Sequence, residues 1–197
     1  NAGAAGTMAL EYGQGAVAAN NASDYVIARG KSITLPAGQN FSTKLGNNGA
    51  VQNYTVVTDQ AGLAAVSNTL AGNYALGADV VLQGNFTPLG DVNNTSFTGN
   101  FHGLGHLISG LSISSPLRDG VGLFGSANGA TLRDVGVVGS VRGQNGVGML
   151  VGSTAGVTVK NSYSSGTVTG DSDVGGLVGV LNTGRISGSW STALVEG

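Results

Sequence analysis

A glycine-rich block recurs at a constant spacing in the last third of the chain, and this period restricts the possible folds more than any other feature of the sequence. The three blocks occupy residues 121–125 (Val-Gly-Leu-Phe-Gly), 147–152 (Val-Gly-Met-Leu-Val-Gly) and 174–179 (Val-Gly-Gly-Leu-Val-Gly). Their last glycines, Gly125, Gly152 and Gly179, give a period of 27, and positions after each block repeat with it. A period of this length, filled with short apolar runs and glycine turns, is typical of a solenoid in which each repeat is one coil.

A weaker match extends the repeat toward the N-terminus. Residues 108–113 align with residues 132–137 at an offset of 24, which predicts one shorter coil and at least four consecutive coils. At the other end, Gly197 aligns with Gly143 and Gly170. Because the chain stops at a coil boundary, we expect it to be a piece of a longer protein or a subunit that stacks end to end.

The composition indicates that these coils are built from strands. Only 9% of the residues are charged and 36 of the 197 are glycine, whereas surface helices need many charged helix formers. The apolar fraction of 41% is large enough for a buried core. We therefore predict an all-β fold, a parallel β-helix. Three columns of side chains are expected to point inward: Leu132, Val159 and Ile186; Leu123, Leu150 and Leu177; and Val141, Val168 and Val195.

Period-two alternation also predicts which side chains face outward. In residues 162–164 and 189–191 the two flanking serines are expected to face the core, so Tyr163 and Trp190 form an outward column that continues from Ser112 and Gly136. The recurrent glycines are expected at corners, where the backbone needs positive φ or close approach.

The N-terminal half has weaker signals. Residues 59–70 predict one short capped helix, with Gly72 as its stop. Residues 1–22 are expected to be a frayed end or an incomplete coil. Strands are predicted at residues 25–28, 32–35, 53–58, 74–82 and 97–101. The chain thus divides into a strand-rich β-helix or cap region (1–58), a helix with irregular coils (59–107) and regular repeats (108–197).

Several classes of function are excluded or disfavoured by composition. The chain has no cysteine, which excludes a disulfide scaffold and a thiolate metal site. With a net charge of −2 and eight scattered basic residues, we expect no nucleic-acid partner. No apolar run is long enough to span a bilayer, and we expect neither membrane insertion nor a cofactor.

Some of these blocks resemble a known family. Residues 161–166, 174–179 and 184–191 are similar to the GLUG repeat of large bacterial surface proteins, although Met149 stands where that repeat usually has glycine. Residues 35–45, 53–57, 72–79, 86–90 and 97–106 look like filamentous-haemagglutinin-type exoproteins. The resemblance implies a right-handed parallel β-helix in a secreted passenger of a two-partner system, located at the bacterial cell surface and used in adhesion or biofilm cohesion. It implies no catalytic residue.

Three small constellations are candidates for chemistry. Residues 120–125 match the glycine pattern of a dinucleotide loop, but the same glycines recur in every coil, which favours a repeat corner. His102 and His106 are four residues apart, yet glycines between them argue against a helical metal pair and for a turn. Asp171 and Asp173 are two carboxylates, too few for a calcium site, so we expect a solvated turn.

The surface candidates are two pairs of residues on adjacent coils. Arg133 and Lys160 are expected to stack facing outward as solvated basic groups, with no column of acids beside them. Tyr163 and Trp190 are expected to stack on each other, and the alternative is that they grip a sugar face or a neighbouring filament.

These observations lead to one functional expectation and two alternatives. We expect a non-catalytic structural and adhesive rod whose partner is a polysaccharide or a cell-surface receptor. The alternatives are an extracellular filament subunit that associates through its solenoid ends, and a carbohydrate-active β-helix enzyme, which would need a cluster of acids or of Lys and Arg in a groove.

Overall fold

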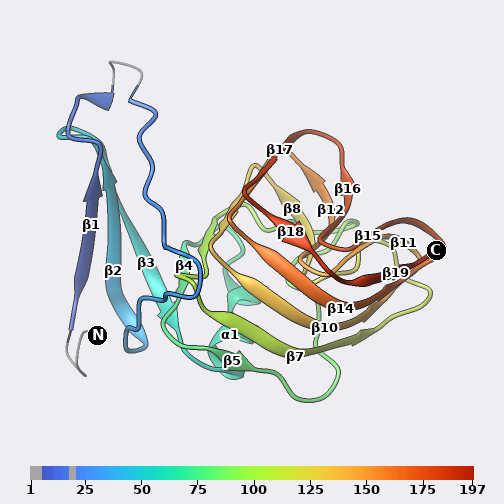
Figure 1. The fold of residues 1–197 in the computed structure, drawn as a ribbon. Helices are drawn as coiled ribbons and strands as arrows, with labels where there is room; N and C mark the ends of the chain where they lie inside the picture. The colour runs from blue at the N-terminus through green and yellow to red at the C-terminus, as the bar shows by residue number, and fades with distance from the viewer. Residues whose placement is uncertain (1–5, 18–20) are drawn as a thin grey trace.

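The protein is a β-solenoid of about five turns, with 48% of its residues in strands and 5% in helices. A computed structural model describes residues 6–17 and 21–197. Figure 1 shows the coils stacked from β5 and β7 up to β17 and β18, with a three-stranded extension, β1 to β3, standing beside them. The predicted all-β solenoid with a single short α-helix is confirmed. No helix in the described part of the chain is long and apolar enough to cross a membrane.

Four sheets form the walls of the solenoid. Sheet A contains, in spatial order, β1 (Met8–Tyr12), β2 (Gly38–Leu45), β3 (Val51–Val57), β4 (Tyr74–Leu76), β6 (Asn100–His102), β9 (Thr131–Arg133), β13 (Val157–Lys160) and β17 (Gly184–Ser187). Sheet B contains β5 (Val80–Val81), β7 (Leu107–Ser114), β10 (Gly136–Arg142), β14 (Tyr163–Thr169), β18 (Trp190–Ser191) and β19 (Leu194–Glu196). Sheet C contains β8 (Phe124–Asn128), β12 (Val151–Ala155) and β16 (Val178–Leu181), and sheet D contains β11 (Asn145–Gly148) and β15 (Ser172–Gly175).

Each complete repeat crosses all four walls once. The chain runs from β9 in sheet A to β10, β11 and β12, and then returns to sheet A as β13. The pairs between these coils are parallel, and the register from β9 to β13 and from β10 to β14 equals the sequence period of 27. Equivalent side chains therefore stack in columns, as the repeat predicts.

The predicted inward columns are confirmed in the inner coils. Leu132 pairs with Val159 and Val141 pairs with Val168, and all four are fully buried. The last members of these columns, Ile186 and Val195, keep the register but are 39% and 42% exposed. The third column is buried as well: Leu123, Leu150 and Leu177.

The backward alignment at an offset of 24 is wrong. In the structure Val137 pairs with Ile108 and Val141 pairs with Ile113, so the offset is 29 before a bulge and 28 after it. The coil before the regular repeats is therefore longer than they are: the offset is 31 between β6 and β9, 29 and then 28 between β7 and β10, and 27 between β8 and β12. As a result the residue beside Gly136 is Leu107 and not Ser112.

Turns between sheets A and B use residues that tolerate left-handed backbone. Asp134 and Asn161 have φ of 54° and 48°, and Gly188 follows in the same column at 60°. Asp and Asn adopt this conformation more readily than other side chains do. The Nδ2 atom of Asn161 donates to Asp134 Oδ1 at 3.2 Å, which links one corner to the next.

Glycines of the repeated block allow close packing of the backbone. A Cβ atom at Gly152 would lie 2.3 Å from the backbone nitrogen of Val121 in the preceding coil. Any side chain here would push β12 away from the backbone of the preceding coil, which explains why this position is glycine. The prediction of close approach is thus confirmed for this glycine.

The helix closes one end of the core. α1 (Gln60–Ala65) continues into a 3₁₀ turn, η2 (Val66–Asn68), and the Asp59 side chain caps it by accepting from the Gly62 nitrogen at 2.8 Å. Leu63 and Val66 are fully buried in the main core, which also holds Phe97, Phe101 and Phe124. The helix predicted at residues 59–70 is confirmed, with slightly shorter bounds.

The N-terminal region differs most from its prediction. Residues 8–12, expected to be frayed or part of a coil, form β1, which pairs in parallel with β2. β2 and β3 form an antiparallel hairpin, and β2 was not predicted. The strands predicted at residues 25–28 and 32–35 are absent from the structure; between them the chain turns, and the Lys31 nitrogen donates to the Ala28 carbonyl oxygen at 2.9 Å. The expectations for residues 1–5 and 18–20 lie outside the described residues, and the three-part division of the chain stays a prediction.

A second, smaller core lies on the outer face of sheet A. It contains Leu35, Phe41, Tyr54, Val56, Ala75 and Leu104. Residues 22–36, which we call the strap, run along this face, and Ile27, Ile33 and Leu35 of the strap pack into the small core. β4 is therefore covered on both faces and is buried at every position.

Candidate functional site

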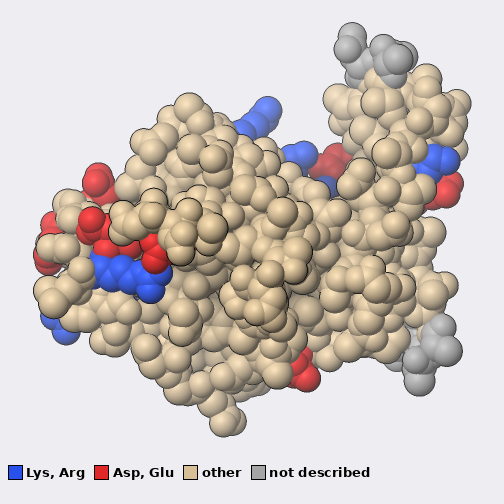
Figure 2. Space-filling model, turned by 180° about the vertical axis from the view of Figure 1, so that it is seen from behind, with Lys and Arg blue, Asp and Glu red and all other residues tan. Residues whose placement is uncertain are grey.

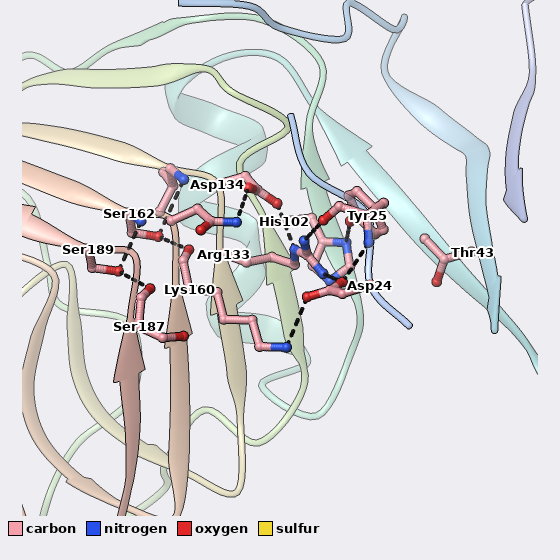
Figure 3. A network of polar contacts seen from close by, with 12 residues as sticks. Asp24, Tyr25, Thr43, His102, Arg133, Asp134, Lys160, Ser162, Ser187 and Ser189 are labelled. Atoms are coloured by element: carbon pink, nitrogen blue, oxygen red, sulfur yellow. Dashed lines mark hydrogen bonds and ion pairs between the residues drawn. The ribbon is translucent and has the colours of Figure 1, made fainter. Parts of the chain in front are cut away.

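Three polar side chains form a column on the outer face of sheet A. His102, Arg133 and Lys160 lie in register on β6, β9 and β13. Each follows an inward residue of the core, so alternation points all three away from the solenoid interior. The strap crosses this column, and Figure 3 shows its residues Asp24 and Tyr25 among the three side chains.

Arg133 is the centre of a polar cluster, which consists of Asp24, Tyr25, Arg133, Asp134 and Lys160. Its guanidinium donates to Asp134 Oδ2, Asp24 Oδ1 and the Tyr25 carbonyl oxygen, each at 2.6 Å, and lies 3.8 Å from the centre of the Tyr25 ring. Lys160 Nζ reaches the other oxygen of Asp24 at 3.0 Å. Both oxygens of the Asp24 carboxylate are therefore engaged, and the cluster ties the strap to two coils.

The prediction that Arg133 is a solvated group is wrong. Its side chain is only 5% exposed, and that of Asp134 is 2% exposed, whereas that of Lys160 is 35% exposed. Alternation predicts the outward direction of Arg133 correctly, but the strap then covers it. The acids that were not expected beside the two basic groups come from the strap and from a corner turn.

Charge and burial shift the pKa values in this cluster. Burial opposes the charge on the Asp24 carboxyl, but hydrogen bonds from Arg133 and Lys160 outweigh this effect and lower its pKa. Burial likewise opposes the charge on Arg133, yet Tyr25, Asp24 and Asp134 raise the pKa of its guanidinium. Both groups are held in their charged forms.

The two histidines have structural positions and lie in separate networks. His102 is buried, and its Nδ1 atom lies 2.8 Å from the Tyr25 hydroxyl while its Nε2 atom lies 3.3 Å from the Tyr54 hydroxyl. Burial, together with the charge of Arg133, lowers the pKa of His102 to about 3. The ring is therefore neutral at physiological pH.

His106 fastens a different part of the strap. Its ring lies 3.0 Å from Asp79 Oδ1 and 2.9 Å from the carbonyl oxygen of Ile33. The Leu107 backbone nitrogen also donates to Asp79, and this bond, with His106, lowers the pKa of the Asp79 carboxyl. Within the described residues there is no group of three potential metal ligands, and neither histidine lies in one.

A groove of about 480 Å³ opens beside the polar cluster. One side is residues 26–31 of the strap, and the other side is Tyr163 and Trp190 from the starts of β14 and β18. Its floor is the corner column between sheets A and B: Gly105, Asp134, Asn161 and Gly188. The groove thus forms where the strap leaves the outer face of sheet A and passes over the corners.

The aromatic wall of the groove is a stacked pair. The Tyr163 and Trp190 rings lie 4.9 Å apart at an angle of 9°, and Trp190 is 39% exposed. Below them the Tyr163 ring covers Gly136, where an added Cβ would lie 2.3 Å from the ring. The predicted stacking of Tyr163 and Trp190 is confirmed.

Two cations of the strap line the same groove. The Arg29 guanidinium carbon lies 4.9 Å from the centre of the Trp190 ring, a cation–π contact, and Lys31 lies two residues farther along. Among the described residues no carboxylate lies within ion-pair distance of Arg29 or Lys31. Sequence reasoning missed both, because they lie outside the repeats and approach Trp190 only through the path of the strap.

The remaining candidates take ordinary roles. Residues 120–125 are part of the repeated turns and do not join a strand to a helix. Asp171 and Asp173 are exposed at the start of β15, and Asp173 has a φ of 53°. Gly146 occupies the same turn one coil earlier with a φ of 63°, so Asp173 marks a turn position.

The acidic groups in and beside the groove are already paired with bases. Of the carboxylates here, Asp134 is buried against Arg133, and Asp24 beside the groove has a lowered pKa. A general acid needs a carboxyl whose pKa is raised, and a lyase base needs a Lys or Arg that loses its proton. Arg133 has a raised pKa and is enclosed by acids, so it is poorly suited to act as a base.

Charges elsewhere on the molecule are sparse. Figure 2 shows small groups of acidic and basic side chains near the edges of one face, with an uncharged surface between them.

Comparison of the chain with family models, curated proteins and solved structures found no match.

Proposed function

We propose that the chain is a non-catalytic segment of a secreted bacterial surface protein, a rigid rod that serves in adhesion or in cohesion of a biofilm matrix. The observation that carries this proposal is the equality of sequence period and strand register over successive coils. Such a stack joins its coils by backbone hydrogen bonds along one axis and locks them with aliphatic columns. A structure of this kind keeps its shape over distance, which suits a spacer that presents binding surfaces.

The resemblance of the blocks at residues 161–166 and 174–179 to GLUG repeats gives the proposal its biological setting. From that resemblance we infer export by a two-partner system and a location at the cell surface. Support for adhesion comes from the groove, because it places on the outside of the rod a stacked aromatic pair and two cations that no described carboxylate neutralises. The partner we propose is a polysaccharide or a cell-surface receptor.

The test is an adhesion assay run beside an activity assay. Beads carrying the chain are applied under flow to a surface of bacterial matrix polysaccharide, and detachment force is compared with that of beads carrying an unrelated soluble protein. In parallel, the same polysaccharides are incubated with the chain and assayed for new reducing or unsaturated ends. Retention without cleavage supports the proposal, whereas failure to adhere or the appearance of new ends contradicts it.

A filament subunit is the second candidate. The last described coil exposes Leu194, Val195 and Ile186, which in inner coils correspond to buried or paired positions. Exposed apolar side chains beside strand edges favour pairing with a further coil, and in this candidate function another copy supplies it. Electron microscopy and light scattering of the purified chain distinguish concentration-dependent fibres from monomers.

A carbohydrate-active enzyme is the third candidate, because Arg133, Lys160, Asp24 and Asp134 do gather beside a groove. Their pairing argues against it, since each acid already neutralises a base. The activity assay above decides between the enzyme and the rod.

A further inference from the structure

We propose that the groove between the strap and the Tyr163–Trp190 pair binds a carboxylated sugar, such as a uronic acid residue of an acidic polysaccharide. This inference rests on the proposed adhesive function and specifies the chemical class of the ligand. Three independent properties of the groove lead to it: its charge, its aromatic wall and its size.

The charge of the groove is positive because the carboxylate among its described lining residues is already neutralised. Asp134 lines the floor, but its Oδ2 atom accepts from Arg133 and its Oδ1 atom from Asn161. Arg29 and Lys31 have no such partner among the described residues. A ligand carboxylate that enters the groove would therefore meet two uncompensated cations.

The aromatic wall supplies the second element of sugar recognition. Tyr163 and Trp190 are parallel rings stacked 4.9 Å apart, so each covers one face of the other, and Trp190 remains 39% exposed. The C–H groups on one face of a pyranose ring pack well against such rings, and the sugar hydroxyls can then turn toward polar groups. Asn161 and Tyr163 supply polar atoms to the lining of the groove.

The position of Arg29 links charge and stacking. Its guanidinium lies over the Trp190 ring, 4.9 Å from the ring centre, so a ligand carboxylate that draws this exposed side chain toward itself opens that face of the ring to the sugar. A carboxylate on the pyranose ring can reach this guanidinium while the ring contacts the aromatic pair. A short acidic peptide would satisfy the cations but would leave the aromatic wall without a matching flat surface.

The size of the groove fits one or two sugar residues. Its volume of about 480 Å³ lies within the usual range for small-ligand sites. The polar cluster fixes the strap on one side, through Asp24 and Tyr25, so the groove is formed before any ligand arrives. A preformed site loses less conformational entropy on binding.

Trp190 is the only tryptophan in the chain, so its fluorescence reports on this groove alone. We would titrate the chain with trigalacturonate, with the same trisaccharide as its methyl ester, with the neutral trisaccharide maltotriose and with tetra-aspartate. Calorimetry of the same titrations detects any binding that leaves the Trp190 emission unchanged. The expected result is saturable binding of trigalacturonate, with at least tenfold weaker binding of the other three probes.

Variants locate the binding. Arg29→Gln combined with Lys31→Gln is expected to weaken trigalacturonate binding at least tenfold, while Arg142→Gln, an exposed cation on β10 outside the groove, leaves it unchanged. No binding of trigalacturonate, equal binding of its methyl ester or of tetra-aspartate, or an equal loss with Arg142→Gln would each overturn the inference. Circular dichroism of each variant confirms that the fold is retained, which is expected because all three side chains are exposed.

The outcome is distinguishable from that of the proposed function. If the Arg29 and Lys31 variant adheres to matrix polysaccharide as strongly as the original chain, the groove is not the adhesive site, and the rod proposal stands. If the chain binds trigalacturonate in the groove and also cleaves it, the sugar site stands and the non-catalytic function fails.

Discussion

The repeated coils and the strap are both attached to sheet A, but different interactions hold them. Successive coils are joined by parallel strand pairing and by columns of aliphatic side chains, repeated once per turn. The strap has no strand pairing and depends on Leu35 and its neighbours in the small core, on the polar cluster around Arg133, and on separate contacts such as that of His106 with the Ile33 carbonyl oxygen. Many similar contacts thus stabilise the coils, whereas a few distinct contacts hold the strap.

This difference has a consequence for function. A segment that is held by few contacts opens at a lower free-energy cost than one held by many. The groove lies between these two kinds of structure, with one wall in each. Its shape therefore depends on interactions that can be changed without altering the solenoid, and the following predictions test this separation.

The largest effect is expected at the centre of the polar cluster. Replacing Arg133 with Met leaves the buried Asp134 carboxylate without its main partner and removes the link to Asp24. We expect the free energy of unfolding to fall by about 3–5 kcal/mol, and the strap to become accessible to proteases. Urea denaturation and limited proteolysis with mapping of the cleavage sites measure the two effects.

Lys160→Met is the matched control, since Lys160 lies in the same column and binds the same carboxylate of Asp24. Its side chain is partly exposed, so we expect a loss of no more than about 1 kcal/mol and little added cleavage. Similar small losses for both variants would mean that the cluster does not hold the strap.

The next effect tests the coils. Leu132→Ala creates a cavity in a fully buried column, and we expect a loss of about 3 kcal/mol in the free energy of unfolding. Ile186→Ala changes the same column where it is 39% exposed, and the expected loss is about 1 kcal/mol or less. Denaturation midpoints in urea give both values. If the strap is released by Leu132→Ala before the coils unfold, the two regions are not held independently.

The same comparison explains how far the sequence predicts this fold. The period of 27 specifies the register, the inward columns of Leu132 and Val141, and the stacking of Tyr163 on Trp190, because each depends on residues one period apart. Because the same pattern recurs in several coils, the register can be predicted from more than one pair of positions. The helix is also predictable, because its cap and its apolar positions are local.

Features that depend on one long-range contact were not predictable. Arg133 meets Asp24 across 109 residues, and His106 meets Ile33 across 73 residues. No local pattern in residues 22–36 indicates that this segment crosses sheet A, so the sequence suggested strands there and a solvated Arg133. The offset of 24 failed for a related reason, since the coil before the regular repeats is longer than they are and a bulge breaks the register between β7 and β10.

A third prediction uses pH to weaken the small outer core. The pKa of His102 is lowered from its usual 6.5 to about 3, mainly by burial, so the unfolded chain takes up a proton at this residue in a range where the folded chain does not. Stability from the neutral ring is therefore complete above pH 6.5 and is lost as the pH falls toward 3. In the middle of this window we expect a loss of about 1.4 kcal/mol per pH unit from this residue.

His102→Gln is expected to reduce that slope between pH 6 and pH 4, at the cost of some stability at pH 7. Urea denaturation at several pH values provides the measurement, with His106→Gln as the control because it leaves the contacts of His102 intact. An unchanged slope in His102→Gln would show that other groups cause the acid sensitivity, of which Asp24 and Asp79 are the first to examine because their pKa values are also lowered.

The smallest effect is expected where the two regions meet. Tyr163→Ala removes one ring of the stacked pair and uncovers Gly136, and we expect a loss of about 1 kcal/mol in stability and a shift of the Trp190 emission toward longer wavelength. Ser165→Ala, on the same strand but outside the groove, serves as the control and is expected to change neither quantity.

Protease sensitivity of residues 22–36 is the decisive measurement, because Arg29 contacts Trp190 directly. If the strap stays protected from proteases in Tyr163→Ala, the polar cluster is sufficient to hold it. If the strap is cleaved as readily as in Arg133→Met, the aromatic pair also holds it. The stability of the strap then depends on the coils more than the contacts around Arg133 suggest.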